Sequence, residues 1–347
     1  MVPVVESERR LQHAGMIQPA RISYAFIVVM LLMVALLHLA TPFITVLFCY
    51  FALSKLKFGG RKAVAVTLFL ILMTVLGYGF YYFVKQAYHA LPRIANTAIP
   101  LVIEYAQKKG IEPPFSDYDS LKDLAMQTVT EKISGVGKYA KEGLFQIASL
   151  IIGVVVAVSL FLNARFDFGQ DPNASKDNLY LVIGNEIAQR FRTFYRSFDT
   201  VMGAQLLIAL INTTLTAVFM RWNAFPYQTV IVVLTFVCGL LPIVGNLISN
   251  ALILSVALTL SPKLVLIALI FLIVIHKLEY FLNSKIIGHR IRNPMWLTLL
   301  GLILGEKLMG VPGMILAPVV LHYLKVEVSR NRFSEPVAGG GTATPST

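Results

Sequence analysis

The chain has 347 residues, of which 56% are hydrophobic and only 14% charged, and its formal net charge is +12. Soluble domains carry about 25% charged residues. This composition, with a mean hydropathy of +0.71, excludes an ordinary soluble domain and predicts a protein that spans a membrane several times. The basic residues gather at the ends of apolar runs, which fits cytoplasmic loops and anionic lipid headgroups better than nucleic acid.

The first part of the chain predicts a cytoplasmic N-terminus followed by three apolar passes. Residues 1–21 are polar and basic, which places them in the cytoplasm by the positive-inside rule, and no cleaved signal peptide is expected. The transmembrane region 22–84 contains apolar runs at 22–39, 42–53 and 64–84. Because the first two runs are nearly contiguous, we expect a tight helical hairpin that returns the basic cluster at 55–62 to the cytoplasm.

Residues 85–145 differ from the apolar runs because their acidic and basic residues nearly balance. Apolar residues recur at helical spacing from Leu121 to Leu144, and an earlier helix is expected at 94–109. The segment is therefore predicted to form an extracytoplasmic helical domain. It could be a binding platform, or an amphipathic hairpin that packs on its neighbours. A transmembrane helix is predicted next, at 146–162.

Residues 163–200 form a polar segment whose second half has a helical pattern. A largely aromatic stripe runs from Ile187 to Phe198, with arginines beside it. An apolar stripe flanked by basic residues is typical of a helix that lies along a membrane surface. This segment is therefore predicted to lie on the cytoplasmic interface.

The C-terminal transmembrane unit, residues 201–326, contains two interrupted apolar regions. Its apolar runs lie at 201–220, 227–241, 247–260, 264–283 and 295–324. The second and third runs are short and are separated by LPIVGN at 241–246, and the last run is split between Gly305 and Gly313. The chain as a whole predicts an all-α polytopic membrane protein with about eight transmembrane helices. Its C-terminal half is predicted to contain two hairpins interrupted by Gly and Pro. These hairpins would be re-entrant if their tips stop inside the membrane.

The first interruption supplies candidate residues for a substrate or ion path. Interrupted helices leave backbone groups and dipole ends free at membrane depth, where secondary transporters bind their substrates. Pro242 and Gly245 form the break, and Asn246 and Asn250 follow it on one helical face. Their amide oxygens could bind a hydroxylated solute or sodium, and helix–helix hydrogen bonding is an equal alternative.

Titratable residues supply further path candidates. His276 and Glu279 are three residues apart on one helix and could form a proton relay, whereas Lys277 is expected to extend toward the interface. Glu306 and Lys307 stand in the middle of the second interrupted run. They either touch water at a hairpin tip or line a polar path at the end of a re-entrant loop.

The bends of the C-terminal unit are assigned to glycine and proline, which interrupt or kink helices. The predicted hairpin and hinge residues are Gly288, Pro294, Gly305, Gly310, Pro312, Gly313 and Pro318. Gln205 and Asn212 share one helix face and are expected to form interhelical hydrogen bonds. The sequence contains no catalytic motif, no grouping with metal-ligand spacing and no nucleotide-binding loop. We therefore predict a protein that is not an enzyme and that uses no metal or cofactor.

Two motifs in the last third of the chain carry a family resemblance. The first is LPIVGN at 241–246, with its Pro-x-x-Gly break, and the second is KIIGHRIRNPMWLTLLGLILGEKLMGVPGMILAP at 285–318. Both resemble motifs of the autoinducer-2 exporter (AI-2E) family of bacterial multi-pass membrane transporters. Glu279 fits the acidic residue that usually precedes the second motif, whereas Ser284 stands where the family commonly has Pro. The resemblance implies an oligomeric exporter, and family members have been linked to export of a signalling furanone and to cation/proton antiport.

The combined expectation is a secondary transporter or exporter of the bacterial cytoplasmic membrane. It would move a small hydrophilic solute, such as a signalling molecule of the autoinducer-2 type, along a gradient. The alternatives are a Na+(Li+)/H+ antiporter and a non-transporting membrane scaffold or regulator. The expected partners are membrane lipid, the small-molecule or ion substrate and further copies of the chain, without nucleic acid. The low-complexity tail 327–347 is predicted to be disordered and cytoplasmic.

Overall fold

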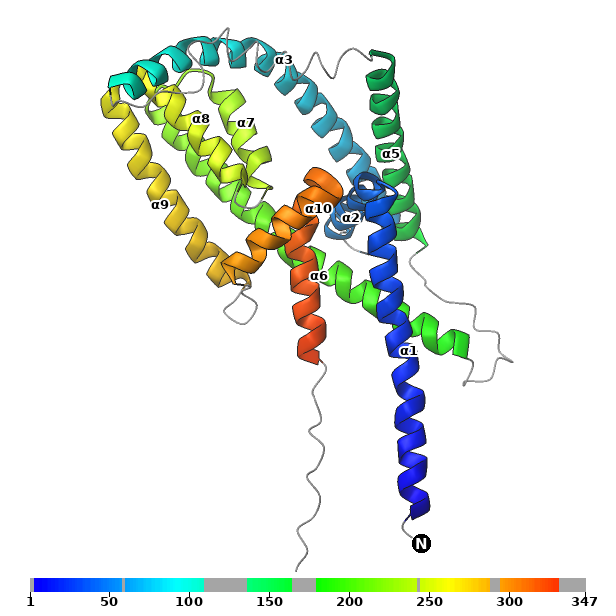
Figure 1. The fold of residues 1–347 in the computed structure, drawn as a ribbon. Coiled ribbons are helices and arrows are strands. Elements are labelled where there is room, and N and C mark those ends of the chain that lie inside the picture. Colours follow the sequence, from blue (N-terminus) through cyan, green and yellow to red (C-terminus); the bar gives the residue numbers. More distant parts are fainter. Residues whose placement is uncertain are drawn as a thin grey trace, which may run out of the picture.

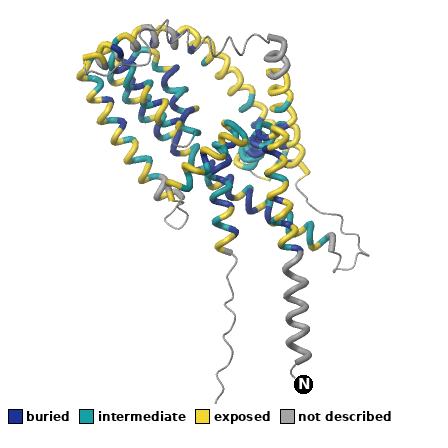
Figure 2. Tube along the Cα trace, in the orientation of Figure 1, coloured by how far each residue is buried: buried dark blue, intermediate teal, exposed yellow. Residues whose placement is uncertain are grey.

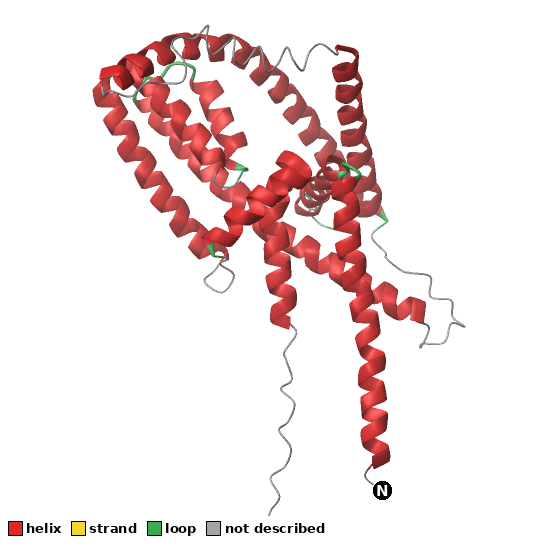
Figure 3. Ribbon diagram, in the orientation of Figure 1, coloured by secondary structure: helices red, strands yellow, loops and turns green. Residues whose placement is uncertain are grey.

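The computed structural model describes residues 3–57, 60–108, 136–163, 179–241, 244–287 and 294–330, and every element within these ranges is an α-helix (Figure 3). The helices are α1 (Pro3–Leu36), α2 (Ala40–Lys55), α3 (Lys62–Lys108), α5 (Val136–Leu162), α6 (Leu179–Trp222), α7 (Gln228–Gly239), α8 (Val244–Leu260), α9 (Pro262–Ile287) and α10 (Met295–Arg330). Among these described helices, 6 are long and apolar enough to cross a membrane, and α2, α7 and α8 are shorter apolar helices. The prediction of an all-α polytopic membrane protein is confirmed.

Apolar clusters hold the described helices together. The first joins α2, the start of α3 and the end of α5 around Leu53 and Phe69. The second joins α1, α2, α6 and α10 around Phe198 and Val319. The third joins the later part of α3, the end of α6, and helices α7, α8 and α9 around Ile231. Because α3 and α6 each contribute to the third cluster and to an earlier one, they connect the N-terminal helices to α7–α9 (Figure 1).

In α3, two predicted elements merge into one. The span predicted at 64–84 and the helix predicted at 94–109 are parts of a single 47-residue helix that arches over α7 and α8 (Figure 1). Its middle is exposed (Figure 2). Large apolar and aromatic residues such as Tyr78, Phe80 and Tyr88 are among the exposed ones. An exposed apolar surface of this kind suits contact with lipid. Most of the remaining part of the predicted extracytoplasmic domain lies outside the described residues.

In α6, the helix predicted for the membrane surface and the span after it also form one helix, of 44 residues. The aromatic stripe does not lie on a surface. Phe194 and Phe198 are buried in the second cluster, and the ring of Phe198 packs edge-on against that of Phe48 with centroids 5.1 Å apart. The structure therefore differs from the prediction because an amphipathic stripe can be covered by other helices as well as by a membrane surface.

The first predicted hairpin is formed by α7 and α8, which pack side by side (Figure 1). At the break, the Leu241 N–H donates to the Cys238 carbonyl oxygen at 2.8 Å and the Gly245 N–H donates to the Leu241 carbonyl oxygen at 3.2 Å. A Cβ at Gly245 would collide with the carbonyl oxygen of Cys238. Glycine is therefore the residue that lets the start of α8 approach the end of α7. Pro242 lies outside the described residues.

The second predicted hairpin is α10, which folds back on itself at Gly310 (Figure 1). Gly310 has φ 64° and ψ −146°, a conformation that only glycine adopts readily. The entering leg (295–309) and the leaving leg (311–330) meet backbone to backbone, since a Cβ on Gly305 or Gly313 would collide with the carbonyl oxygen of the other glycine. The predicted interruption of this run is thus a hairpin.

The predicted prolines of α10 lie at its start and along its leaving leg. The carbonyl oxygen of Pro294 accepts bonds from the N–H groups of Leu297 and Thr298 at 3.1 and 3.2 Å, which begins the entering leg. Pro312 and Pro318 lie inside the leaving leg. This leg continues to Arg330, four residues into the tail predicted from residue 327. Gly288 lies outside the described residues.

We expect Gly313→Ala to destabilise the protein by about 2 kcal/mol, because the added methyl group overpacks the contact between the two legs of α10. Its matched control is Gly77→Ala, where a Cβ meets nothing within 4 Å. Alanine should leave stability unchanged or raise it by up to about 1 kcal/mol there. The midpoint of thermal unfolding in detergent measures both changes, and equal midpoints would contradict the close contact of the legs.

Candidate functional site at the first hairpin break

Three polar side chains from different helices meet beside the α7–α8 break. The Asn246 Nδ2 on α8 donates to the Glu279 Oε2 on α9 at 2.7 Å. The Asn212 Nδ2 on α6 approaches the same oxygen at 3.5 Å, a distance at which a hydrogen bond is weak. These helices converge because α9 packs on both α6 and α8.

A fourth polar side chain stabilises the break itself. The Gln205 Nε2 on α6 donates to the carbonyl oxygen of Gly239 at 2.6 Å. Gly239 is the last residue of α7, where carbonyl groups lose their helical partners. Gln205 and Asn212 lie on the same face of α6, so this face supplies one polar group to the break and one to the carboxylate. We call Gln205, Asn212, Asn246 and Glu279 the hairpin-break site.

Glu279 lies in an apolar environment with neutral hydrogen-bond donors. It is half-buried on α9, whose residues Pro262–Leu282 form a candidate membrane span. None of the ion pairs formed by the described residues includes Glu279. Asn212 is buried, and its Oδ1 has no hydrogen-bond partner among the described residues. The site thus combines one carboxylate, amide groups and a free acceptor oxygen.

The structure brings together some of the residues predicted from the sequence and separates others. Asn246 and Glu279 are in contact, and Gly245 lies directly before Asn246. Asn250 is half-buried one turn further along α8, and no hydrogen bond of its side chain occurs among the described residues. His276 is exposed and does not join Glu279 by a hydrogen bond in this part of the chain. The predicted partner of Glu279 along α9 is replaced by partners from α6 and α8.

The predicted pair at the α10 tip lies at a separate place. Lys307 lines a cavity of about 300 Å3 together with His38, Thr41 and Gln146, which belong to the α1–α2 turn, α2 and α5. Glu306 does not line this cavity, and its carboxylate lies 3.8 Å from the Lys307 Nζ. Both side chains are exposed, so this ion pair contributes little stability. The described structure thus leaves Lys307 facing a polar cavity and Glu306 outside it.

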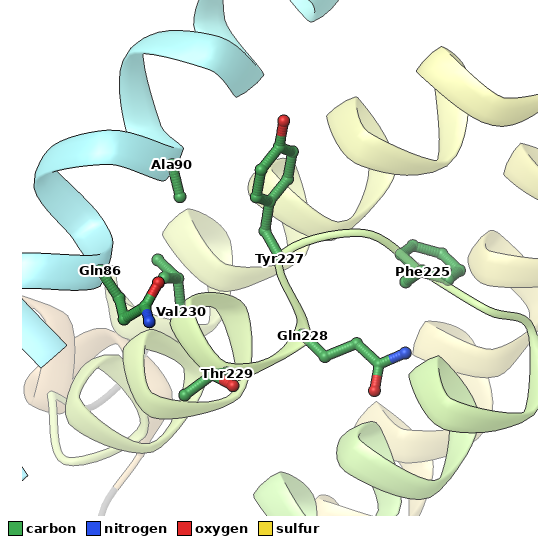
Figure 4. A pocket seen from close by; sticks show the side chains of 7 residues that line it. All are labelled: Gln86, Ala90, Phe225, Tyr227, Gln228, Thr229 and Val230. Atoms are coloured by element: carbon green, nitrogen blue, oxygen red, sulfur yellow. The ribbon is translucent and has the colours of Figure 1, made fainter. Parts of the chain in front are cut away.

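A second cavity lies at the other end of α7 (Figure 4). It has a volume of about 340 Å3 between Gln86 and Ala90 on α3 and the residues that lead into α7, including Tyr227, Gln228 and Thr229. Its polar lining is uncharged. Tyr227 has φ 56°, a left-handed conformation that costs about 1–3 kcal/mol for a residue other than glycine. Helix α7 therefore has an uncharged polar cavity at its start and the hairpin-break site at its end.

Sequence reasoning missed how these residues combine. The spacing of Asn212 along α6 predicts an interhelical hydrogen bond, and its amide approaches Glu279 on α9, but nothing in the spacing identifies Glu279 as the partner. The buried ion pair between Arg190 and Glu327 was also missed. The sequence feature that could have indicated this pair is that Glu327 is the only acidic residue near the end of the last apolar run.

The fold and the site define a multi-pass membrane protein whose polar residues gather at interrupted helices. The family model for "AI-2E family transporter" matches residues 14–330, and the chain belongs to this transporter family. It is also similar to "Putative transport protein YdbI" of Bacillus subtilis (strain 168), with 27% identity over 54% of this chain and 57% of that protein. "Putative transport protein YrrI" of the same organism is 26% identical over 52% of this chain and 54% of that protein. The chain thus aligns with about half the length of these relatives, and the predicted family is confirmed.

We expect Asn246→Ala and Glu279→Ala to be coupled in a double-mutant cycle. A hydrogen bond to a charged group contributes about 1.5–3 kcal/mol, so the summed effects of the single changes should differ from the double change by about that amount. Asn250→Ala is the matched control, and its effect should add to that of Glu279→Ala. Unfolding of the purified protein in mixed micelles measures both cycles. Additive energies in the first cycle would contradict the contact.

Proposed function

We propose that the protein is a secondary transporter that moves a small hydrophilic solute across the bacterial cytoplasmic membrane, driven by a gradient. A signalling molecule of the autoinducer-2 type is one such solute. The observation that carries the proposal is the Asn246–Glu279 contact at 2.7 Å, in which an acid within a candidate span meets the interrupted helix pair. Acids in membrane spans are costly and occur where they bind substrates, ions or protons.

The hairpin-break site offers the groups that a hydrophilic solute needs. Glu279 accepts hydrogen bonds, Asn246 donates one to it, and the buried Asn212 oxygen has an unused acceptor position. A hydroxyl group can donate to such oxygens and replace the present amide donors. An uncharged polar cavity also lies at the opposite end of α7, where the same hairpin begins. The transporter is expected to act as a homo-oligomer with both termini in the cytoplasm.

A second candidate, Na+(Li+)/H+ antiport, is favoured by the oxygen atoms of the same site. Amide side chains present their oxygen or their nitrogen depending on a rotation of the amide group. Rotating the amides of Asn212 and Asn246 would place their oxygens beside the Glu279 carboxylate. Oxygen ligands of this kind suit a hard cation, and no basic side chain pairs with Glu279 among the described residues.

We expect Glu279→Gln to reduce solute flux by about 10- to 100-fold, because the loss of one charge-assisted hydrogen bond corresponds to about 1.5–3 kcal/mol. Flux is measured in proteoliposomes with a panel of labelled hydrophilic solutes, with and without a pH gradient. Glu104→Gln is the matched control, since Glu104 is exposed near the end of α3 and pairs with Lys108 on its own helix. Wild-type flux by Glu279→Gln for a transported solute would overturn the assignment.

The two candidates separate in proteoliposomes loaded with a pH-sensitive dye. Antiport predicts that external NaCl or LiCl changes the internal pH, that KCl does not, and that Glu279→Gln abolishes the response. Solute transport without antiport predicts flux of a panel solute and no response to either cation. If neither assay detects activity of the folded wild-type protein, the scaffold alternative is favoured.

We expect the double change Glu306→Ala and Lys307→Ala to lower solute flux while leaving membrane insertion intact. The physical reason is that, among the described residues, Lys307 is the one Lys or Arg that lines the cavity at the α10 tip. Proteoliposome flux, normalised to the amount of protein inserted, measures the effect. Wild-type flux from the double variant would show that the pair merely marks the hairpin tip.

A further inference from the structure

A buried charged cluster joins α1, α6 and α10 away from the hairpin-break site. The Arg190 Nη1 on α6 donates to the Glu327 Oε2 on α10 at 2.9 Å, and the Tyr24 hydroxyl on α1 donates to the same oxygen at 3.0 Å. The Glu327 side chain is 4% exposed and that of Arg190 is 10% exposed. We call Tyr24, Arg190 and Glu327 the Glu327 cluster. It is the one place among the described residues where a buried ion pair connects three helices.

Arg190 has further partners that do not involve α10. Its Nη2 donates to the Glu186 Oε2 at 3.0 Å, one turn back on α6. Its guanidinium group lies over the Tyr24 ring, 4.4 Å from the centroid. If α10 moved away, Arg190 would keep a carboxylate and an aromatic ring as partners. Glu327 would keep neither its cation nor the Tyr24 hydroxyl.

The cluster is also incompletely bonded. The Glu327 Oε1, the Arg190 Nε and the Tyr323 hydroxyl are buried and have no hydrogen-bond partner among the described residues. Each such group costs about 1–3 kcal/mol, so the cluster is not arranged for maximal stability. The free Oε1 is the atom of this carboxylate that can accept a proton without displacing an existing donor.

Because of where Glu327 lies in the fold, its protonation state affects how easily the leaving leg of α10 can separate from α6. Glu327 lies on the leaving leg of α10, which follows the bend at Gly310. Separating this leg from α6 would strand a buried carboxylate without a partner, which is strongly unfavourable. Adding a proton to that carboxylate removes the charge and therefore most of the cost.

We propose that Glu327 is a proton-binding site that controls the attachment of the α10 leaving leg to α6 and α1. In the conformation described, Glu327 is ionised and holds the leg through Arg190 and Tyr24. A proton taken up on Oε1 neutralises the carboxylate, the leg separates, and Arg190 stays charged beside Glu186. This site goes beyond the proposed transport function, because it can be tested without any solute.

The charged and titratable groups around the site come from each helix that packs on it. Those that face or adjoin Glu327 are Arg190 and Glu186 on α6, Tyr24 on α1, and Tyr323, His322 and Lys325 on α10 itself. Of these, only Arg190 and Tyr24 donate hydrogen bonds to Glu327 in the described part of the chain. Glu327 is therefore the group whose charge decides whether α10 remains attached.

Hydrogen–deuterium exchange of the solute-free full chain in lipid nanodiscs tests the proposal. Peptides covering 186–197 and 319–328 are followed over about pH 4 to 9, which spans the ordinary titration of Glu and His, with correction for the intrinsic rate. We expect wild-type exchange to rise at low pH with a single midpoint. Glu327→Gln, which mimics the protonated acid, should exchange rapidly at every pH, and Glu104→Gln should keep the wild-type midpoint.

A second variant keeps the test decisive if Glu327→Gln does not fold. Tyr24→Phe removes one donor to the ionised carboxylate and leaves Arg190 in place. Losing a hydrogen bond to the ionised carboxylate should weaken the attachment of the leaving leg, so both peptides should exchange faster than in the wild type at neutral pH. The proposal is overturned if wild-type exchange in these peptides does not depend on pH, if Glu327→Gln keeps the wild-type pH dependence, or if Tyr24→Phe leaves exchange at neutral pH unchanged.

Discussion

The structure depends on one constraint, which is that backbone polar groups within a membrane need hydrogen-bond partners. Continuous helices satisfy it, and they make up every described element of this chain. The constraint is hardest to meet at the α7–α8 break, where the end of α7 leaves carbonyl groups free. Gln205 of the neighbouring helix α6 donates to the Gly239 carbonyl there at 2.6 Å. This hydrogen bond helps to fix the position of α6 along the hairpin. Asn212, on the same face of α6, lies beside Glu279.

The two long helices explain how the parts of the molecule are connected. Helix α3 packs with α2 and α5 at its start and with α7–α9 later, and α6 packs with α1 and α10 before it reaches the same unit. A shift of α6 along its axis would therefore affect both acidic sites. Arg190 near its start contacts Glu327, and Asn212 nearer its end contacts Glu279. Helix α6 thus contacts two acids that both lie in candidate membrane spans.

The sequence predicted the fold class and both interruptions, because glycine, proline and hydrophobic periodicity are local signals. Gly310 and Gly245 were recognised as breaks from their neighbours alone. The contacts of the site could not be predicted in this way, since Asn212 and Glu279 are 67 residues apart and Arg190 and Glu327 are 137 apart. Local patterns also could not show that α3 and α6 continue through their polar segments. The aromatic stripe of α6 fits a membrane surface and a protein core equally well, and only its neighbours decide between them.

The two acids differ in how the protein compensates their charge, and this difference supports the separate roles proposed for them. Glu279 is half-buried and receives hydrogen bonds from neutral amides, so a solute or cation that enters can take the place of these donors without breaking an ion pair. Glu327 is nearly fully buried and is bonded to a cation, so an added cation would compete with Arg190, whereas a proton needs only the free Oε1. The first arrangement suits the binding and release of a substrate. The second arrangement suits control of helix attachment. Neutralising Glu327 also removes its ion pair with Arg190, which holds α10 in place.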